Sequence, residues 1–70
     1  MTTTTEYHVT GMSCSHCEMA VRGEVSKLDG VQAIDVSAAN GRLIVTSAAP
    51  IADDAVIAAV DEAGYAAVRA

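Results

Sequence analysis

GMSCSHCEM, residues 11–19, marks the point where the apolar periodicity of the chain changes from that of a strand to that of a helix. Before it, apolar Tyr7 and Val9 alternate with polar His8 and Thr10, as in a strand with one buried face. From about Ser15, within the stretch, apolar side chains recur along one helix face: Cys17, Val21, Val25 and Leu28. We therefore expect a strand, a loop that carries two cysteines, and a helix, in that order.

The limits of this helix are indicated by local signals. Ser15 and Glu18 have the S-x-x-E spacing of a capping box, which predicts a helix start at about Ser15. Gly30 suits a left-handed cap after the last turn. Gly23 lies inside the helix, where glycine costs about 1 kcal/mol relative to alanine.

The middle of the chain has the pattern of a hairpin. Val31–Ser37 alternates again, with Ile34 and Val36 expected to face inward. Asn40-Gly41 is a strong short-range hairpin signal. The returning strand is expected to bury Leu43 and Val45. A second helix is expected to bury one apolar face, made of Val56, Ala59, Val60 and Ala63.

The second helix is expected to open at Pro50, to hold Asp53 and Asp54 in its first turn, and to close at Gly64. A last short strand is expected over residues 65–69. The order βαββαβ predicts an α+β, ferredoxin-like sandwich, with two helices on one face of a four-stranded antiparallel sheet. We expect a flexible N-terminal tail over residues 1–5, because "TTTT" reads as a frayed end, and a single domain over residues 6–70.

Composition excludes several functions. The net charge of -5 argues against nucleic acid, whose phosphates require a basic face. The start of the chain lacks the basic and apolar parts of a signal peptide, and no stretch approaches the length of a membrane span. We therefore expect a cytoplasmic protein without direct membrane insertion. In a reducing cytosol, two cysteines at this spacing favour metal ligands or catalytic thiols over a structural disulfide.

The two cysteines have a definite place in this fold. Cys14 falls in the loop after the first strand, and Cys17 falls in the first turn of the helix. Unpaired backbone N–H groups and the helix dipole stabilise negative charge there, which favours thiolates. Soft sulfur ligands select copper(I) and also suit zinc. Two thiolates satisfy copper(I), which accepts two ligands in a near-linear arrangement.

Two alternatives to a copper(I) site have less support from the residues: a structural zinc site and a thiol oxidoreductase. A structural zinc site requires four protein ligands, and the chain has only two cysteines and two histidines, His8 and His16. A thiol oxidoreductase with a C-x-H-C pair would have a larger core, a Trp before the first cysteine and a cis-proline facing the pair. Here Met12 and Ser13 precede the first cysteine, Trp is absent, and the one proline lies far along the chain. The residues favour metal binding over redox catalysis.

The chain resembles the heavy-metal-associated domain family. GMSCSHC matches the family motif G-M-x-C-x-x-C, and DEAGY, residues 61–65, matches the segment that ends the second helix of these domains. The resemblance extends from about Glu6 to Arg69 and is greatest to the free-standing bacterial copper chaperones. It implies a copper(I) carrier and not an enzyme.

The resemblance also implies roles for single residues. Cys14 and Cys17 would be the copper(I) ligands, and Met12 would pack beneath the loop without binding the ion. Tyr65 would lie in the loop beside the site, where bacterial copper chaperones often carry tyrosine. His16 matches a histidine of several bacterial members, where it would modulate the thiols or the handling of the metal.

The partner implied by the resemblance is a copper-transporting P-type ATPase, met at its soluble metal-binding domain or at the site where metal enters its membrane domain. Two chains could also share copper through four thiolates as a homodimer. Related domains bind other soft ions. Zinc and cadmium versions tend to carry an acidic residue before the first cysteine, where this chain has Ser13. Mercury versions share the motif but are usually exported.

Overall fold

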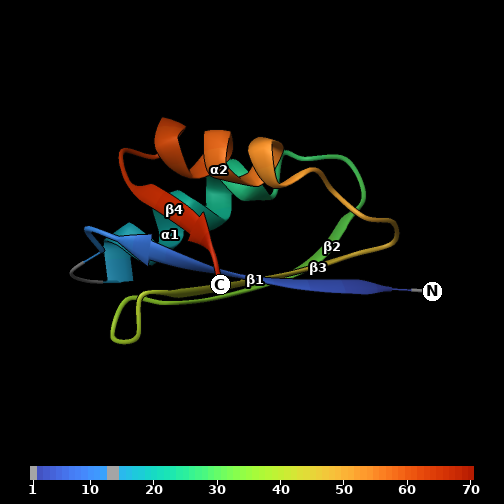
Figure 1. Cartoon of the computed structure of the whole chain (residues 1–70). Helices are drawn as coiled ribbons and strands as arrows, with labels where there is room; N and C mark the ends of the chain where they lie inside the picture. Colours follow the sequence, from blue (N-terminus) through green and yellow to red (C-terminus); the bar gives the residue numbers. More distant parts are fainter. Residues whose placement is uncertain (1, 13–14) are drawn as a thin grey trace.

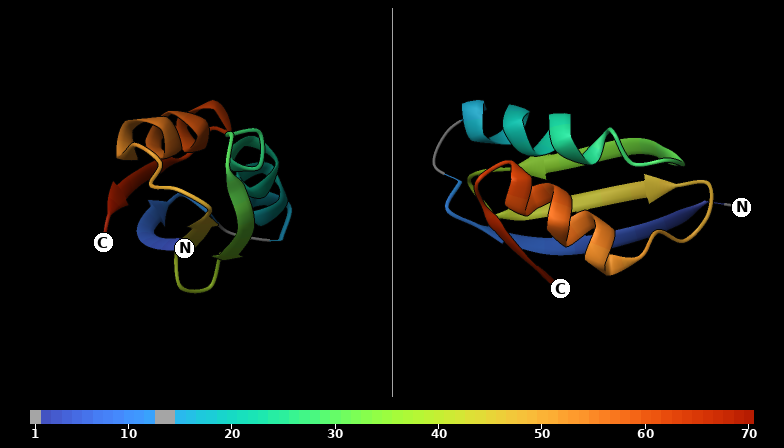
Figure 2. Two further views of the ribbon diagram at one scale, coloured as in Figure 1. Left: turned by 90° about the vertical axis from the view of Figure 1, so that its right-hand side faces the viewer. Right: turned by 90° about the horizontal axis from the view of Figure 1, so that it is seen from above.

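The computed structural model describes residues 2–12 and 15–70, without the side chain of Ser15. The element order is βαββαβ: β1 (Thr3–Thr10), α1 (Ser15–Val25), β2 (Val31–Ser37), β3 (Arg42–Ser47), α2 (Asp53–Glu62) and β4 (Ala66–Arg69). The strands form one antiparallel sheet in the order β2-β3-β1-β4. Both helices cover the same face of this sheet (Figures 1 and 2). The predicted ferredoxin-like α+β sandwich is confirmed.

The hydrophobic core lies between the sheet and the two helices. Its largest fully buried side chains come from both layers: Tyr7, Leu43, Val21, Val25, Val56 and Val60. The strand residues alternate and the helix residues recur every three to four positions, so each element turns one apolar face to the same interior. Cys17 belongs to the same buried stripe of α1 as Val21 and Val25, as its spacing predicts.

The N-terminal end of β1 differs from expectation. In place of a frayed end, residues 3–5 extend β1 and pair with the last residues of β3, with Thr3 opposite Ser47 and Thr5 opposite Val45. Threonine is β-branched and favours the extended backbone, so this run can continue a strand that has a partner. The ordered domain therefore begins before Glu6.

The hairpin between β2 and β3 has a four-residue loop, residues 38–41, in which Asn40-Gly41 takes its predicted place. Gly41 has φ +63°, a conformation that glycine adopts without strain. Its carbonyl oxygen accepts a hydrogen bond from the Val9 N–H at 2.7 Å. A Cβ on Gly41 would lie 2.9 Å from the Val9 carbonyl oxygen, so the loop fits closely against β1.

The second helix begins later than expected. α2 starts at Asp53, after Ala52, whose φ of -59° and ψ of 135° are not helical, so Pro50 lies before the helix and does not open it. Asp53 and Asp54 occupy the first turn, as predicted. Gly64 follows the helix with φ +96°, and its N–H donates to the Asp61 carbonyl oxygen at 2.9 Å. β4 begins at Ala66, one residue after the expected start.

Candidate metal site

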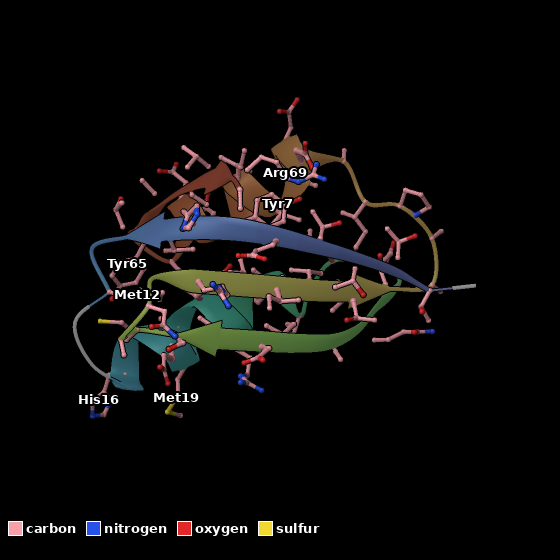
Figure 3. The ribbon with its side chains drawn as sticks, turned by 60° about the horizontal axis from the view of Figure 1, so that its bottom comes forward. Tyr7, Met12, His16, Met19, Tyr65 and Arg69 are labelled. Atoms are coloured by element: carbon pink, nitrogen blue, oxygen red, sulfur yellow. The ribbon has the colours of Figure 1, made fainter. Side chains whose placement is uncertain are left out.

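Gly11, the residue that follows β1, lies beside Tyr65, the residue that precedes β4. Gly11 follows β1 with φ +93°, and a Cβ built on it would lie 3.2 Å from Cδ1 of the Tyr65 ring. Met12 and Tyr65 are both partly buried and pack against the hydrophobic core. Figure 3 shows their side chains at the same end of the molecule, where β1 leads toward α1. The backbone before the cysteine loop is therefore supported by a tyrosine ring and by the core.

Cys17 lies in the first turn of α1 and is 8% exposed. Its side chain belongs to the inward stripe of the helix, so it is close to the helix N-terminus and yet covered. The N-terminal dipole stabilises a thiolate at this position. Ser13 and Cys14 lie outside the described residues, and the role expected for Cys14 as the second ligand stays a prediction from the motif.

Glu18 makes a contact that the sequence does not predict. Its Oε2 accepts a hydrogen bond from the backbone N–H of Ala38 at 2.6 Å, which joins the first turn of α1 to the β2–β3 loop. The capping box expected from Ser15 and Glu18 falls partly outside the described side chains. A charged carboxylate is a strong acceptor for a loop N–H that no strand partner uses.

His16 and Met19 lie on the outer side of α1. His16 is exposed, and Met19 is 68% exposed. Figure 3 shows both side chains projecting from the helix on the same side. His8 is exposed on β1, between Tyr7 and Val9, whose side chains are buried. The structure therefore places Met12 and Tyr65 at the same end of the molecule, and His16 exposed in the first turn of α1, next to Cys17 in the sequence.

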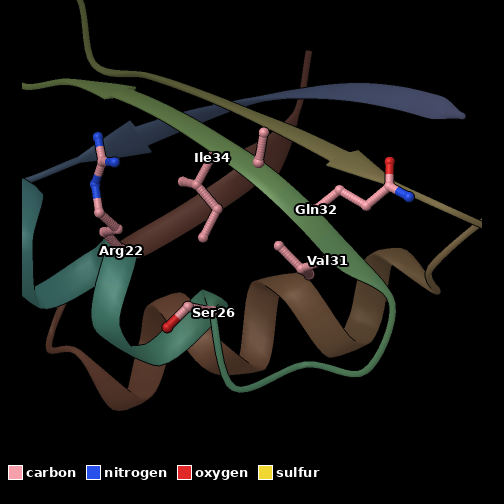
Figure 4. A pocket seen from close by; sticks show the side chains of 6 residues that line it. Arg22, Ser26, Val31, Gln32 and Ile34 are labelled. Atoms are coloured by element: carbon pink, nitrogen blue, oxygen red, sulfur yellow. The ribbon is translucent and has the colours of Figure 1, made fainter.

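Away from the cysteine loop, a shallow hollow of about 370 Å³ lies between α1 and β2 (Figure 4). Its lining residues are Arg22, Ser26, Val31, Gln32, Ala33 and Ile34. This lining contains no thiol, imidazole or carboxylate. Among residues 2–12 and 15–70, no three His, Cys, Asp or Glu side chains gather where they could hold a metal ion.

The structure gives Gly11 and Glu18 roles that the sequence does not predict. Gly11 is required by its positive φ and by the closeness of Tyr65, and the glycine before Met12 was a signal for such a turn. The bond between Glu18 and Ala38 joins residues 20 positions apart, and no local pattern announces it. No helix in the described part of the chain is long and apolar enough to cross a membrane.

Comparison with known proteins identifies the family of this chain. The family model for the heavy-metal-associated domain matches residues 6–66. The copper chaperone CopZ of Staphylococcus aureus is 36% identical over an alignment of 64 residues, and the match covers 83% of this chain and 87% of that protein.

Solved structures share the fold over nearly the whole chain. One described as the CopZ metallochaperone has a TM-score of 0.87 and 33% identity, and the match covers 94% of this chain and 100% of that one. A copper binding domain from HMA7, a P-type ATPase, has a TM-score of 0.89 and covers 100% of this chain and 95% of that one; its 24% identity shows the fold alone. The family match spans most of the chain, and the chain belongs to the heavy-metal-associated domain family.

Proposed function

We propose that this protein is a cytoplasmic copper(I) chaperone that binds the ion through the thiolates of Cys14 and Cys17. The observation that carries the proposal is the place of Cys17, buried in the first turn of α1, three residues after Cys14 in a chain 36% identical to a copper chaperone. In this proposal the copper ion is cargo and not a resident cofactor, and the protein is a carrier rather than an enzyme.

The ligand set suits a soft ion of low coordination number. Thiolate is the form of cysteine that binds metal, and soft sulfur ligands select copper(I). Cys17 would supply a buried sulfur, because its side chain lies on the face of α1 that turns toward the core. Met12 packs against the core and supports the loop, which leaves binding to the two sulfurs.

Transfer proceeds by exchange of sulfur ligands. A thiolate of the partner approaches from the loop side, since Cys17 is covered, and forms a third copper–sulfur bond. One of the chaperone's own copper–sulfur bonds then breaks, and repetition of the step moves the ion to the partner. Copper stays in the same oxidation state throughout. Because the ligands must be deprotonated, affinity falls as the pH is lowered.

The partner that fits this exchange is a copper-transporting P-type ATPase. The fold of this chain is also that of a copper binding domain from a P-type ATPase, HMA7. Donor and acceptor would then present the same kind of loop to each other. Two copies of this chain can exchange ligands in the same way, which predicts a copper-bridged homodimer at high protein concentration.

An anaerobic competition against a copper(I) chelator tests the proposal. The reduced wild type is compared with Cys14→Ser and with Cys17→Ser, and zinc is added in a parallel series. We expect the wild type to retain one copper(I) per chain. Each variant should lose more affinity than the ~10–100-fold that removal of a group supporting a metal ligand costs. His8→Ala is the control, because it removes an exposed potential ligand outside the loop and should leave the affinity unchanged.

Three results would contradict the proposal. One is failure of the wild type to retain copper(I) against a moderate chelator. Another is displacement of copper(I) by zinc under reducing conditions, which would indicate a zinc module. The third is turnover of disulfide substrates without metal, with mixed disulfides trapped through Cys14 in Cys17→Ser, which would indicate a thiol oxidoreductase.

A further inference from the structure

The first two turns of α1 carry two exposed side chains that the proposed thiol site does not use. His16 and Met19 are three residues apart in the helix, so they lie one turn apart on the same face. Both are exposed, Met19 at 68%, and Figure 3 shows them projecting from α1 on the same side. Cys17 lies between them in the sequence but belongs to the buried face of the helix.

The exposure of Met19 needs a reason other than packing. Met12 is partly buried and packs against the core, which is the usual role of a methionine in a small domain. Met19 and Val68 are the exposed large hydrophobic side chains of the described residues. An exposed thioether and an exposed imidazole one turn apart on a helix offer two metal ligands, and the three rotatable bonds of methionine allow it to reach across that turn.

We propose that His16 and Met19 form a second metal site, on the outer face of α1, for a soft monovalent cation such as Cu(I) or Ag(I). Imidazole and thioether suit such ions, and two ligands are sufficient for them. Zinc prefers four ligands, and no third His, Cys, Asp or Glu joins a cluster of this kind among residues 2–12 and 15–70. The site uses no thiolate, so it is independent of the proposed chaperone function.

Charge decides the strength of this site. The chain carries a net charge of -5, and Glu18 lies in the same turn, which favours a cation. Arg22 is exposed three residues after Met19 in the same helix, and its positive charge disfavours a cation. The positive end of the helix dipole opposes one. Neutral ligands in water and this opposing dipole make the site weaker than a pair of thiolates. The His16–Met19 site therefore holds a second ion once the thiols are loaded.

Silver(I) titration followed by NMR tests the site, because Ag(I) is diamagnetic and shares the ligand preference of Cu(I). The first arm uses Cys14→Ser/Cys17→Ser, which removes the thiols. The second arm uses the wild type and follows the binding of the second equivalent of Ag(I). This arm can be read even if the double variant does not fold. A repeat with anaerobic Cu(I) shows whether both ions bind.

We expect the NMR chemical shifts of the His16 imidazole and of the Met19 methyl group to change together and to saturate at one bound ion per site. His16→Ala and Met19→Leu should each weaken this binding ~10-fold or more, and His8→Ala should not change it. Equal shifts of His8 and His16 would overturn the proposal, as would unchanged binding in Met19→Leu. Loss of chelator-resistant copper in the wild type would contradict the chaperone function while leaving this result unaffected.

Discussion

The carboxylate of Glu18 lies 2.6 Å from the backbone nitrogen of Ala38 and accepts its hydrogen bond. This bond joins the turn of α1 that contains Cys17 to the β2–β3 loop. The same loop is joined to β1 by the bond from the Val9 N–H to the Gly41 carbonyl oxygen. The orientation of the cysteine-bearing turn relative to the sheet therefore depends in part on one acidic side chain.

Glu18→Ala should lower the free energy of unfolding of the metal-free protein by about 1–3 kcal/mol, because it leaves the partly buried Ala38 N–H without its charged acceptor. Glu18→Gln keeps an acceptor oxygen and should lose less than half as much. Urea unfolding gives the two values, and hydrogen exchange of the Ala38 amide should be faster in Glu18→Ala.

Glu62→Ala is the matched control, since it removes the same charge from an exposed position in α2. Its effect should stay within about 0.5 kcal/mol, as for most surface substitutions. An equal loss of stability in the two alanine variants would show that charge, and not the bond to Ala38, is responsible.

Hydrogen bonds among three side chains, Tyr7, Asp53 and Arg69, also join α2 to the sheet. The Tyr7 hydroxyl donates to Oδ1 of Asp53 at 2.9 Å, and Nη1 of Arg69 donates to both oxygens of the same carboxylate at 3.0 Å. Burial of Tyr7, followed by its hydrogen bond to Asp53 and the charge of that carboxylate, raises the pKa of Tyr7 to about 12. β1, α2 and β4 thus meet at one carboxylate.

Tyr7→Phe should change how stability depends on alkaline pH. A tyrosine whose pKa is higher in the folded than in the unfolded chain contributes stability that is complete below pH ~10 and is lost as the pH rises toward ~12. At pH 8 the variant should be less stable by about 1–2 kcal/mol, because Asp53 loses a hydrogen bond. Near pH 12 the wild type should have lost on the order of 2 kcal/mol that the variant does not lose.

Urea midpoints at several pH values between ~8 and ~12 measure both effects. The curves should converge as the pH rises. Parallel curves would mean that the ionisation of Tyr7 is not coupled to folding.

The sequence predicts the parts of this structure that depend on local periodicity. Cys17, Val21 and Val25 share a helical spacing, and their burial follows from it. The strand over residues 3–5 was missed because a run of identical polar residues has no alternation, and its pairing depends on β3. Cys14 remains a ligand by prediction, since the structure does not describe it.

Tertiary contacts of polar side chains could not be predicted in this way. Tyr7 and Asp53 are 46 positions apart, and Asp53 alone reads as an ordinary acidic residue in a first helical turn. Tyr65 was expected near the site from the family resemblance. The glycine at position 11 signals a turn, but the closeness of the Tyr65 ring to it depends on the folded backbone and could not be predicted.

Two glycine substitutions should act in opposite directions. Gly11→Ala forces an L side chain into φ +93° and brings its Cβ to 3.2 Å from the Tyr65 ring, so we expect a loss of about 1–3 kcal/mol and weaker copper(I) binding. Gly23→Ala meets nothing within 4 Å inside α1 and should stabilise the protein by about 0.5–1 kcal/mol.

Thermal unfolding measures the stability of the two variants, and chelator competition measures their copper(I) affinity. Gly23→Ala should leave copper(I) affinity at the value of the wild type, because Gly23 is about two turns along α1 from Cys17. If Gly11→Ala were as stable as the wild type, the proposed support of the cysteine loop by Tyr65 would be incorrect.

The proposed copper(I) site has two sulfur ligands, both from one chain. X-ray absorption at the copper edge, on the monomer fraction of the reduced wild type loaded with one equivalent of copper(I), tests it most directly. We predict two sulfur neighbours and no nitrogen neighbour, and loss of one sulfur in either Cys14→Ser or Cys17→Ser. A spectrum with nitrogen bound directly to copper, or one unchanged in the Cys14→Ser variant, would contradict the account.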